Sequence, residues 1–287
     1  MTARPAGLLG DTTARDYSHK LRLFNSFVEP ELRQAIASLG LKQGMRVLDA
    51  GCGTGEALRW LCDAVAPHGT VVGIDLASAH VSAAHASASG QVFVLQADVR
   101  QPPLAPRSFD LIWSVNTINH LHEPLAAVRG MASLLCPGGR IALGQSSLLP
   151  DMFFAWDSRL ERLTTEAVRR YYRDRYGLSE RDLAGTRSIV GLLRRAGLHS
   201  VRAQTLIVER VSPLSAADEA YLLEAIFHDT WGERLRPYLS GEDYDELTAL
   251  CDPLHPAFAL RRADFHFLQT FSVAVGQVPK SNCNESD

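Results

Sequence analysis

Glycine and acidic residues recur at the ends of short apolar runs in the first half of the chain. The stretch VLDAGCGTGEA places Gly51, Gly53 and Gly55 directly after an apolar run and ahead of a helical pattern. Because glycine has no side chain, such a loop lets the backbone come close to a bound small molecule. The next run, VVGIDL, ends in Asp75, whose carboxylate can accept both hydrogen bonds of a ribose diol. A third run, LQADV, ends in Asp98, so the pattern predicts a nucleoside-type ligand at neighbouring strand ends.

The acidic residues beside the glycines restrict the chemistry of this ligand. Asp49 precedes the loop, and Glu56 occupies the position at which a dinucleotide-binding fingerprint has its third glycine. Two carboxylates would repel a pyrophosphate, but they suit a ligand that carries an ammonium and a sulfonium. No Lys-Ser or Lys-Thr pair follows the glycines, which excludes a phosphate-binding P-loop.

Two histidines could supply acid–base chemistry at the same place. The stretch NTINHLHEP puts His120 and His122 just after the fourth expected strand. A neutral imidazole, with an ordinary pKa of about 6.5, can accept the proton of a phenol or another hydroxyl. The His-x-His-Glu pattern has the right ligand types for a metal but lacks further clustered ligands, so we expect no metal. His80 and His85 fall on the helix after the second strand, where we expect them at the surface and away from the ligand.

A sheet must position these residues. Between residues 46 and 147, five β-rich runs alternate with helical stretches, which predicts βαβ units and a parallel sheet covered by helices on both faces. Two later runs, residues 200–211 and 265–278, are typical of longer strands that complete the sheet as an antiparallel pair. The carboxyl ends of parallel strands meet at one edge, where the residues described above would line a crevice.

We expect one domain with embellishments. A polar composition at both ends predicts disorder there, and the stretch before the first strand reads as one or two helices. Two helical insertions would cover the ligand edge as lids. The expected boundaries are a disordered N-terminus over 1–13, a single domain over 14–278 with its core at 44–147, helical insertions at 148–185 and 213–262, and a disordered tail over 279–287.

Composition excludes several other classes of partner. The net charge is -3, with 29 basic and 32 acidic residues, which leaves no excess for binding phosphate backbones. No apolar run is long enough to span a bilayer, so we expect no nucleic-acid partner, no membrane span and a cytoplasmic location. Aromatic residues gather in the insertions and the last strand, which favours an apolar or aromatic acceptor in an enclosed pocket: Phe153, Phe154, Trp156, Tyr171, Tyr172, Phe227, Trp231, Tyr238, Phe258 and Phe265.

The motifs together resemble the class I S-adenosylmethionine-dependent methyltransferases, and their core is similar to that of the ubiquinone and menaquinone methyltransferases. The resemblance rests on VLDAGCGTG, GIDL, QADV, FDLIWSVNTINHL and LLCPGGRIAL. It implies a Rossmann-like α/β fold with a seven-stranded, mostly parallel sheet of order 3-2-1-4-5-7-6, in which strand 7 is antiparallel. It also implies a cofactor site formed by Tyr17, Asp49, Gly51, Cys52, Gly53, Gly55, Asp75, Leu76, Asp98, Val99 and Asn116.

The function that this resemblance implies is methyl transfer from S-adenosylmethionine to an O or C atom of an apolar or aromatic small molecule, with S-adenosylhomocysteine as product. The acceptor would belong to natural-product or quinone-like metabolism, and His120 or His122 would be the base. A non-methylating enzyme that keeps the cofactor, such as a cyclase, is an alternative, as are a protein methyltransferase and a regulatory module that binds the cofactor without catalysis. A homodimer is possible.

Overall fold

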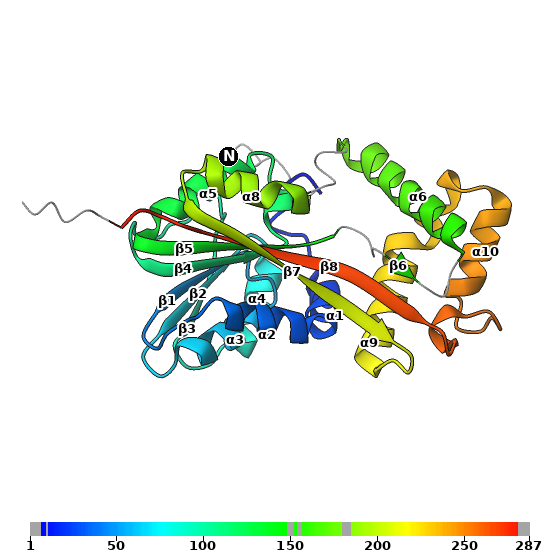
Figure 1. Cartoon of the computed structure of the whole chain (residues 1–287), viewed down its shortest axis with the longest axis horizontal. Coiled ribbons are helices and arrows are strands. Elements are labelled where there is room, and N and C mark those ends of the chain that lie inside the picture. Colours follow the sequence, from blue (N-terminus) through cyan, green and yellow to red (C-terminus); the bar gives the residue numbers. More distant parts are fainter. Residues whose placement is uncertain (1–6, 10, 148–151, 154–156, 180–184, 281–287) are drawn as a thin grey trace, which may run out of the picture.

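A computed structural model describes residues 7–9, 11–147, 152–153, 157–179 and 185–280. Its centre is one mixed sheet (Figure 1). The strands are β1 (Arg46–Ala50), β2 (Thr70–Asp75), β3 (Val92–Gln96), β4 (Phe109–Val115), β5 (Leu135–Ser146), β6 (Met152–Phe153), β7 (His199–Val211) and β8 (His266–Gln277).

The strand order confirms the predicted fold class. The sheet runs β3-β2-β1-β4-β5-β8, with β7 on the outer edge of β8. Strands β1 to β5 are parallel, and β8 is antiparallel to both β5 and β7. The predicted strands 6 and 7 are β7 and β8, so the order is 3-2-1-4-5-7-6. The short β6 is an addition that pairs with β8 beyond the end of β5.

Helices cover both faces of the sheet, as the alternating pattern predicts. One face packs against α1 (Ser18–Phe27), α2 (Glu29–Ser38), α3 (Glu56–Val65) and α4 (Ser78–Ser87). The other face packs against α5 (Pro124–Ser133) and α8 (Gly185–Arg195). Along β5 the two cores alternate, since Ala142 belongs to the first and Leu143 to the second. A short 3-10 turn, η1 (Ile118–His120), follows β4.

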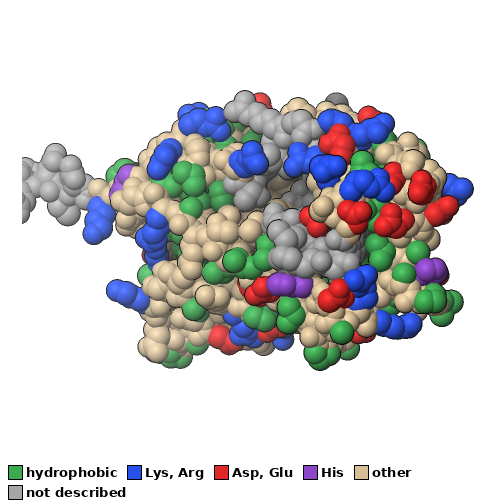
Figure 2. All heavy atoms as spheres, turned by 45° about the vertical axis from the view of Figure 1, so that its right-hand side comes forward, with side chains coloured by type: hydrophobic (Ala, Val, Ile, Leu, Met, Phe, Trp, Pro, Cys, Tyr) green, Lys and Arg blue, Asp and Glu red, His purple; other side chains and the backbone are tan. Residues whose placement is uncertain are grey.

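The second half of the chain adds a helical cap around the outer ends of β7 and β8 (Figure 1). The cap consists of α6 (Ser158–Tyr176), α9 (Ala216–Ala220), the π-helix η2 (Tyr221–Trp231), η3 (Gly232–Tyr238), α10 (Gly241–Cys251) and η4 (Ala259–Arg261). On the face shown in Figure 2, acidic and basic side chains interleave over the cap and form no continuous basic surface. This mixture agrees with the small net charge.

The π-helix is a feature that the sequence pattern did not predict, since its apolar residues fit an ordinary helix. Near its end, the Thr230 hydroxyl donates a hydrogen bond of 2.7 Å to the carbonyl of Ala225, five residues earlier. Gly232 then ends the helix with a positive φ of 39°. Phe227 and Trp231 stack at 5.2 Å inside the cap and are buried, so these two aromatics are core residues.

Two contacts tie the cap to the sheet. Phe27 stacks on Tyr221 at 4.3 Å between ring centroids and meets Phe267 edge-on at 5.3 Å. The guanidinium of Arg210 on β7 pairs with Glu31 of α2 at 2.8 Å and with Asp218 of α9 at 2.9 Å. Helix α1 therefore lies between the sheet and the cap.

Part of the N-terminal segment for which we expected disorder lies within the described residues. Residues 7–9 and 11–13 lie across the carboxyl edge of the sheet, where the amide of Leu8 donates to the carbonyl of His120 at 3.0 Å. The polar composition of this segment suggested disorder. Local sequence could not show otherwise, because the partner of Asp11, His120, lies 109 positions away in sequence. Of the expected tail over 279–287, residues 281–287 lie outside the described residues, as do Phe154 and Trp156. Within the described ranges, no helix is long and apolar enough to cross a membrane.

Candidate functional site

The glycine loop joins β1 to α3 through backbone shapes that favour glycine. Gly51, Gly53 and Gly55 have φ values of 87°, 53° and 91°. A Cβ on Gly51 would lie 2.2 Å from the Thr117 hydroxyl, and one on Gly55 would lie 2.9 Å from the Ala84 Cβ. The first two glycines line a cavity at the carboxyl edge of the sheet, whereas Gly55 packs against α4.

The amides of the loop are engaged within the protein, which leaves its carbonyl groups as the polar atoms it can offer a ligand. The amides of Gly51 and Cys52 donate to the carbonyl of Ile74 at 2.8 and 2.9 Å, and the amide of Gly53 donates to Asp75 at 2.9 Å. None of the described residues donates an N–H or O–H to the carbonyls of Gly51 and Gly53. Carbonyl oxygens attract a cation and repel phosphate, so the loop suits an ammonium or sulfonium.

Asp49 lies buried on β1, close to the glycine loop in sequence. It is 2% exposed, and its Oδ2 has no hydrogen-bond partner among the described residues. Burial, together with the negative charges of Asp75 and Glu56, raises the pKa of Asp49 to about 8. Asp49 does not line the cavity but lies behind the glycine loop. A cation bound in front of the loop would favour the ionised form of this carboxyl.

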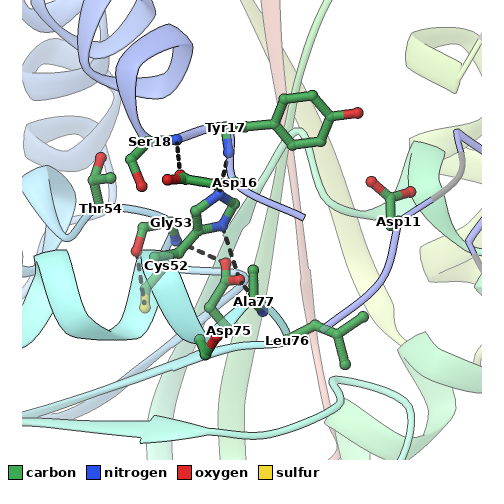
Figure 3. A network of polar contacts seen from close by, with 12 residues as sticks. Asp11, Asp16, Tyr17, Ser18, Cys52, Gly53, Thr54, Asp75, Leu76 and Ala77 are labelled. Carbon is green, nitrogen blue, oxygen red and sulfur yellow. Dashed lines mark hydrogen bonds and ion pairs between the residues drawn. The ribbon is translucent and has the colours of Figure 1, made fainter. Parts of the chain in front are cut away.

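Asp75 ends β2 with its carboxylate held from three directions (Figure 3). Its Oδ2 accepts from the Gly53 amide, and its Oδ1 accepts from the Ala77 amide at 2.9 Å and pairs with the His80 ring at 3.1 Å. The expectation that His80 lies at the surface is therefore wrong: the residue is 7% exposed and lines the cavity. The helical pattern gave no indication of this because the partners of His80 belong to other elements. His85 is exposed, as expected.

The next strand end supplies the other wall. Leu76 and Val99 present apolar surface to the cavity, and Asp98 lines it beside them. Asp98 forms a bidentate pair with Arg100, with N–O distances of 2.7 and 3.0 Å. The hydrogen bond to Asp98 and the negative charge of Asp98 raise the pKa of Arg100, although burial acts to lower it. An apolar face with a polar edge is what a purine ring requires.

Asn116 ends β4 in a left-handed conformation with φ 49°. Its side-chain oxygen accepts from the Ser146 amide at 2.9 Å, and its amide group donates to the Ser146 hydroxyl at 3.2 Å. These bonds join the ends of β4 and β5 and turn the following residues toward the cavity. Asn116 therefore lines the cavity while its side chain holds the strand ends together.

His120 and Asp11 form a dyad above the strand ends. The His120 Nδ1 lies 2.9 Å from the Asp11 Oδ2, and both residues line the cavity. Burial acts to raise the pKa of Asp11. The hydrogen bond and charge of His120 and the charge of Arg15 outweigh it, and the pKa is lowered. The carboxylate is therefore ionised at neutral pH and can fix the ring with Nδ1 protonated. His122 lies at the exposed rim of the same cavity.

Tyr17 closes the remaining side from the residue before α1. Its ring lines the cavity and carries the Arg15 guanidinium over it, 4.2 Å from the ring centroid. Figure 3 shows the ring extending from α1 toward the side on which Asp11 lies. Glu56 accepts from the Asn25 side chain at 2.8 Å and so fastens α1 to the glycine loop.

The structure thus brings most predicted site residues to one cavity. Those that line it are Tyr17, Gly51, Gly53, Asp75, Leu76, Asp98, Val99, Asn116, His120 and His122. Asp49, Cys52 and Gly55 are not among the lining residues, and burial raises the pKa of the Cys52 thiol. Sequence reasoning missed Asp11, Arg15 and His80, for which no local motif exists. In the part of the chain that the structure describes, no group of three or more His, Cys, Asp or Glu side chains is placed to hold a metal.

Comparisons with known proteins agree with this geometry. A family model described as "Methyltransferase domain" matches residues 48–143. The 27-O-demethylrifamycin SV methyltransferase of Amycolatopsis mediterranei is 36% identical over 39% of this chain and 42% of its own length. The chain therefore spans less than half the length of this relative. The Nocamycin O-methyltransferase of Saccharothrix syringae is 27% identical over 86% of this chain and 90% of its own.

A solved structure extends the likeness in fold to almost the whole chain. The crystal structure of the [4+2]-cyclase SpnF covers 96% of this chain and 99% of its own, with a TM-score of 0.52 and 19% identity. At that identity the likeness concerns the fold alone. Residues 48–143 thus match the methyltransferase-domain family, and together with the strand order and the glycine loop these matches support a class I S-adenosylmethionine-dependent methyltransferase.

Proposed function

We propose that this protein transfers the methyl group of S-adenosylmethionine to an oxygen atom of a small organic acceptor. The Asp11–His120 dyad beside the cofactor cavity is the observation that carries the proposal. A hydroxyl must lose its proton to become a good nucleophile, whereas a sulfonium methyl group needs no further activation. A histidine oriented by a carboxylate is the arrangement that such a proton transfer requires.

The cofactor would lie along the carboxyl edge of the sheet. The carbonyls of Gly51 and Gly53, with Asp49 behind them, would meet the ammonium of its methionine part. Asp75 would hold the ribose, and Leu76 and Val99 would enclose the adenine. When bound, S-adenosylmethionine supplies a methyl group activated by a positive sulfonium. The remaining residues position the acceptor and exclude water.

The dyad accounts for the fate of the proton. With the ring fixed by Asp11 on Nδ1, the lone pair of His120 Nε2 is available to the acceptor hydroxyl. The O–H bond breaks as the oxygen forms its bond to the methyl carbon, and the proton passes to Nε2. Asp11 then stabilises the imidazolium by its negative charge. His122 lies at the exposed rim of the cavity, whereas Asp11 orients the ring of His120, so we assign the base to His120.

The names of the relatives support a small-molecule acceptor. One is named for methylation of a demethylrifamycin and another as an O-methyltransferase of nocamycin. The neighbour SpnF is named as a cyclase, which keeps a non-methylating reaction on this fold as the second candidate. The dyad favours methyl transfer because proton removal from a hydroxyl is a step of O-methylation.

Label transfer tests the proposal. The purified protein is incubated with methyl-labelled S-adenosylmethionine and a small-molecule extract, and label in an extractable product is measured together with S-adenosylhomocysteine. Both should appear in equal amounts. Asp11→Asn and His120→Ala should each lower turnover by roughly a hundredfold and leave S-adenosylhomocysteine binding within about threefold of wild type. His85→Ala, on the exposed face of α4, is the matched control.

Three outcomes separate the alternatives. Label in protein would replace the small-molecule acceptor with a protein one. Conversion of a small molecule with no release of S-adenosylhomocysteine would favour the cyclase-type reaction. Equal turnover in the Asp11 and His120 variants and in wild type would remove the dyad from the chemistry and point to an acceptor that loses no proton to the enzyme.

A further inference from the structure

His80 occupies the third position of α4 and belongs to none of the cofactor motifs. Its side chain is 9% exposed and lies between the cavity and the start of α1. The sequence placed it on the surface of an ordinary helix. Its burial beside two cavity-lining residues, Asp75 and Tyr17, therefore calls for an explanation beyond packing.

The two contacts of the ring assign its tautomer. The amide of Tyr17 donates to Nε2 at 3.1 Å, so this nitrogen carries a lone pair. In a neutral imidazole the other nitrogen then carries the hydrogen. Nδ1–H consequently donates to the Asp75 Oδ1 at 3.1 Å. One neutral side chain thus joins the backbone of Tyr17 to the carboxylate at the end of β2.

The contact with Asp75 decides which oxygen faces the ligand. A carboxylate oxygen offers about two lone-pair positions. On Oδ1, the Ala77 amide and the His80 ring fill both, whereas Oδ2 has the Gly53 amide as its single described donor. The ring of His80 therefore holds the carboxylate so that Oδ2 keeps an open position for a ligand hydroxyl.

The contact with Tyr17 belongs to a wider attachment of the N-terminal segment to α4. The carbonyl of Thr13 accepts from the amide of Ser78 at 3.1 Å and from its hydroxyl at 3.3 Å. The chain between Thr13 and Tyr17 is thereby fixed at both ends to the first turn of α4. This stretch carries Arg15 into the cavity, and Asp11 lies just before it.

We propose that His80 is a positioning residue that couples the ribose-binding carboxylate of Asp75 to closure of residues 11–17 over the cofactor. This inference rests on the proposed cofactor site. Through Nδ1, His80 sets the orientation of Asp75. Through Nε2, it holds the segment that brings Asp11 to His120. Binding of the nucleoside and placement of the catalytic dyad are then linked through one ring.

Two variants separate the two contacts. The side-chain amide nitrogen of Asn takes the place of Nδ1, so His80→Asn keeps the donor to Asp75 and loses the acceptor for Tyr17. The side-chain oxygen of Gln takes the place of Nε2, so His80→Gln keeps the acceptor for Tyr17 and loses the donor to Asp75. His85→Asn and His85→Gln, on the same helix but exposed, are the matched controls.

The measurements are the dissociation constant of S-adenosylhomocysteine by calorimetry and hydrogen exchange of residues 11–17 with and without it. His80→Gln should bind about tenfold more weakly, because a hydrogen bond to a charged carboxylate is lost. His80→Asn should bind within about threefold of wild type, yet S-adenosylhomocysteine should no longer slow exchange in residues 11–17. A denaturation curve without ligand reports any loss of stability separately.

Wild-type affinity and wild-type protection in both His80 variants would overturn the proposal, and so would an equal loss of unliganded stability with unchanged affinity and protection. If wild-type protein itself failed to bind S-adenosylhomocysteine, the cofactor site would be wrong, and the role of His80 would fall with it. Binding by wild type with unaffected variants would remove the role of His80 alone.

Discussion

Asp49 offers a test that needs no substrate. Its carboxyl is buried without a partner on Oδ2, and burial raises its pKa from 3.8 to about 8. At neutral pH the folded protein therefore holds a proton on this group, whereas the unfolded chain has lost it. Asp49→Asn replaces the protonated carboxyl with a neutral group of the same shape, and its effect on stability should depend strongly on pH.

The sign and size follow from proton linkage. Unfolding releases one proton between the unfolded and the folded pKa, so this group makes the free energy of unfolding fall as pH rises, by about 1.4 kcal/mol per pH unit. A shift from 3.8 to about 8 corresponds to a total on the order of 5 kcal/mol. Wild type and Asp49→Asn should be similar near pH 4 to 5, and the variant should be more stable by several kcal/mol at pH 8.

Urea denaturation of both proteins at several pH values measures this difference directly. Other titrating groups contribute equally to both and cancel in the comparison. Asp63→Asn, at an exposed position of α3, is the control and should show no pH-dependent difference from wild type. If the difference between wild type and Asp49→Asn were the same at pH 5 and pH 8, the carboxyl would be ionised in the folded state and the raised pKa of Asp49 would be wrong.

Three further substitutions test other parts of the structure. Asp75→Ala should weaken S-adenosylhomocysteine binding by about 1 to 3 kcal/mol in a calorimetric titration, and unchanged affinity would remove this residue from the ribose site. Arg210→Ala leaves the buried Glu31 carboxylate without its partner and should lower the free energy of unfolding by about 3 to 5 kcal/mol, whereas a change below about 1 kcal/mol would show that the pair does not join cap and core. Gly51→Ala places a methyl group against Thr117 in an unfavourable backbone shape and should cost at least about 2 kcal/mol by thermal unfolding; a fully stable variant would contradict the described loop.

The parts of the fold that sequence predicted are those set by local pattern. The alternation of strands and helices between residues 46 and 147 fixed the parallel sheet, and the two long runs near the end fixed the antiparallel pair. The glycine loop and Asp75 were predictable because backbone shape and strand ends are encoded in neighbouring residues. Asp98 followed from the same rule, since parallel strands share one carboxyl edge, whereas Leu76 came from the resemblance to the methyltransferases.

The parts that sequence did not predict depend on distant contacts. Asp11 meets His120 across 109 positions, and Tyr17 meets His80 across 63, so no local spacing reveals either pair. The polar segment that carries Asp11 has no apolar periodicity, which made disorder the natural expectation. The π-helix was not predicted for a different reason. Its apolar residues also fit an ordinary α-helix, so the pattern does not reveal the hydrogen bond from Thr230 to Ala225.

The central claim is that the carbonyl-lined loop and the strand-end carboxylates form a site for a cationic nucleoside. A calorimetric titration of the wild-type protein with S-adenosylmethionine, S-adenosylhomocysteine and NAD tests it most directly. The account predicts that both sulfur-containing ligands bind at one site per chain and that NAD does not, because its pyrophosphate would meet the loop carbonyls. Binding of NAD, or no binding of either S-adenosyl compound, would contradict it.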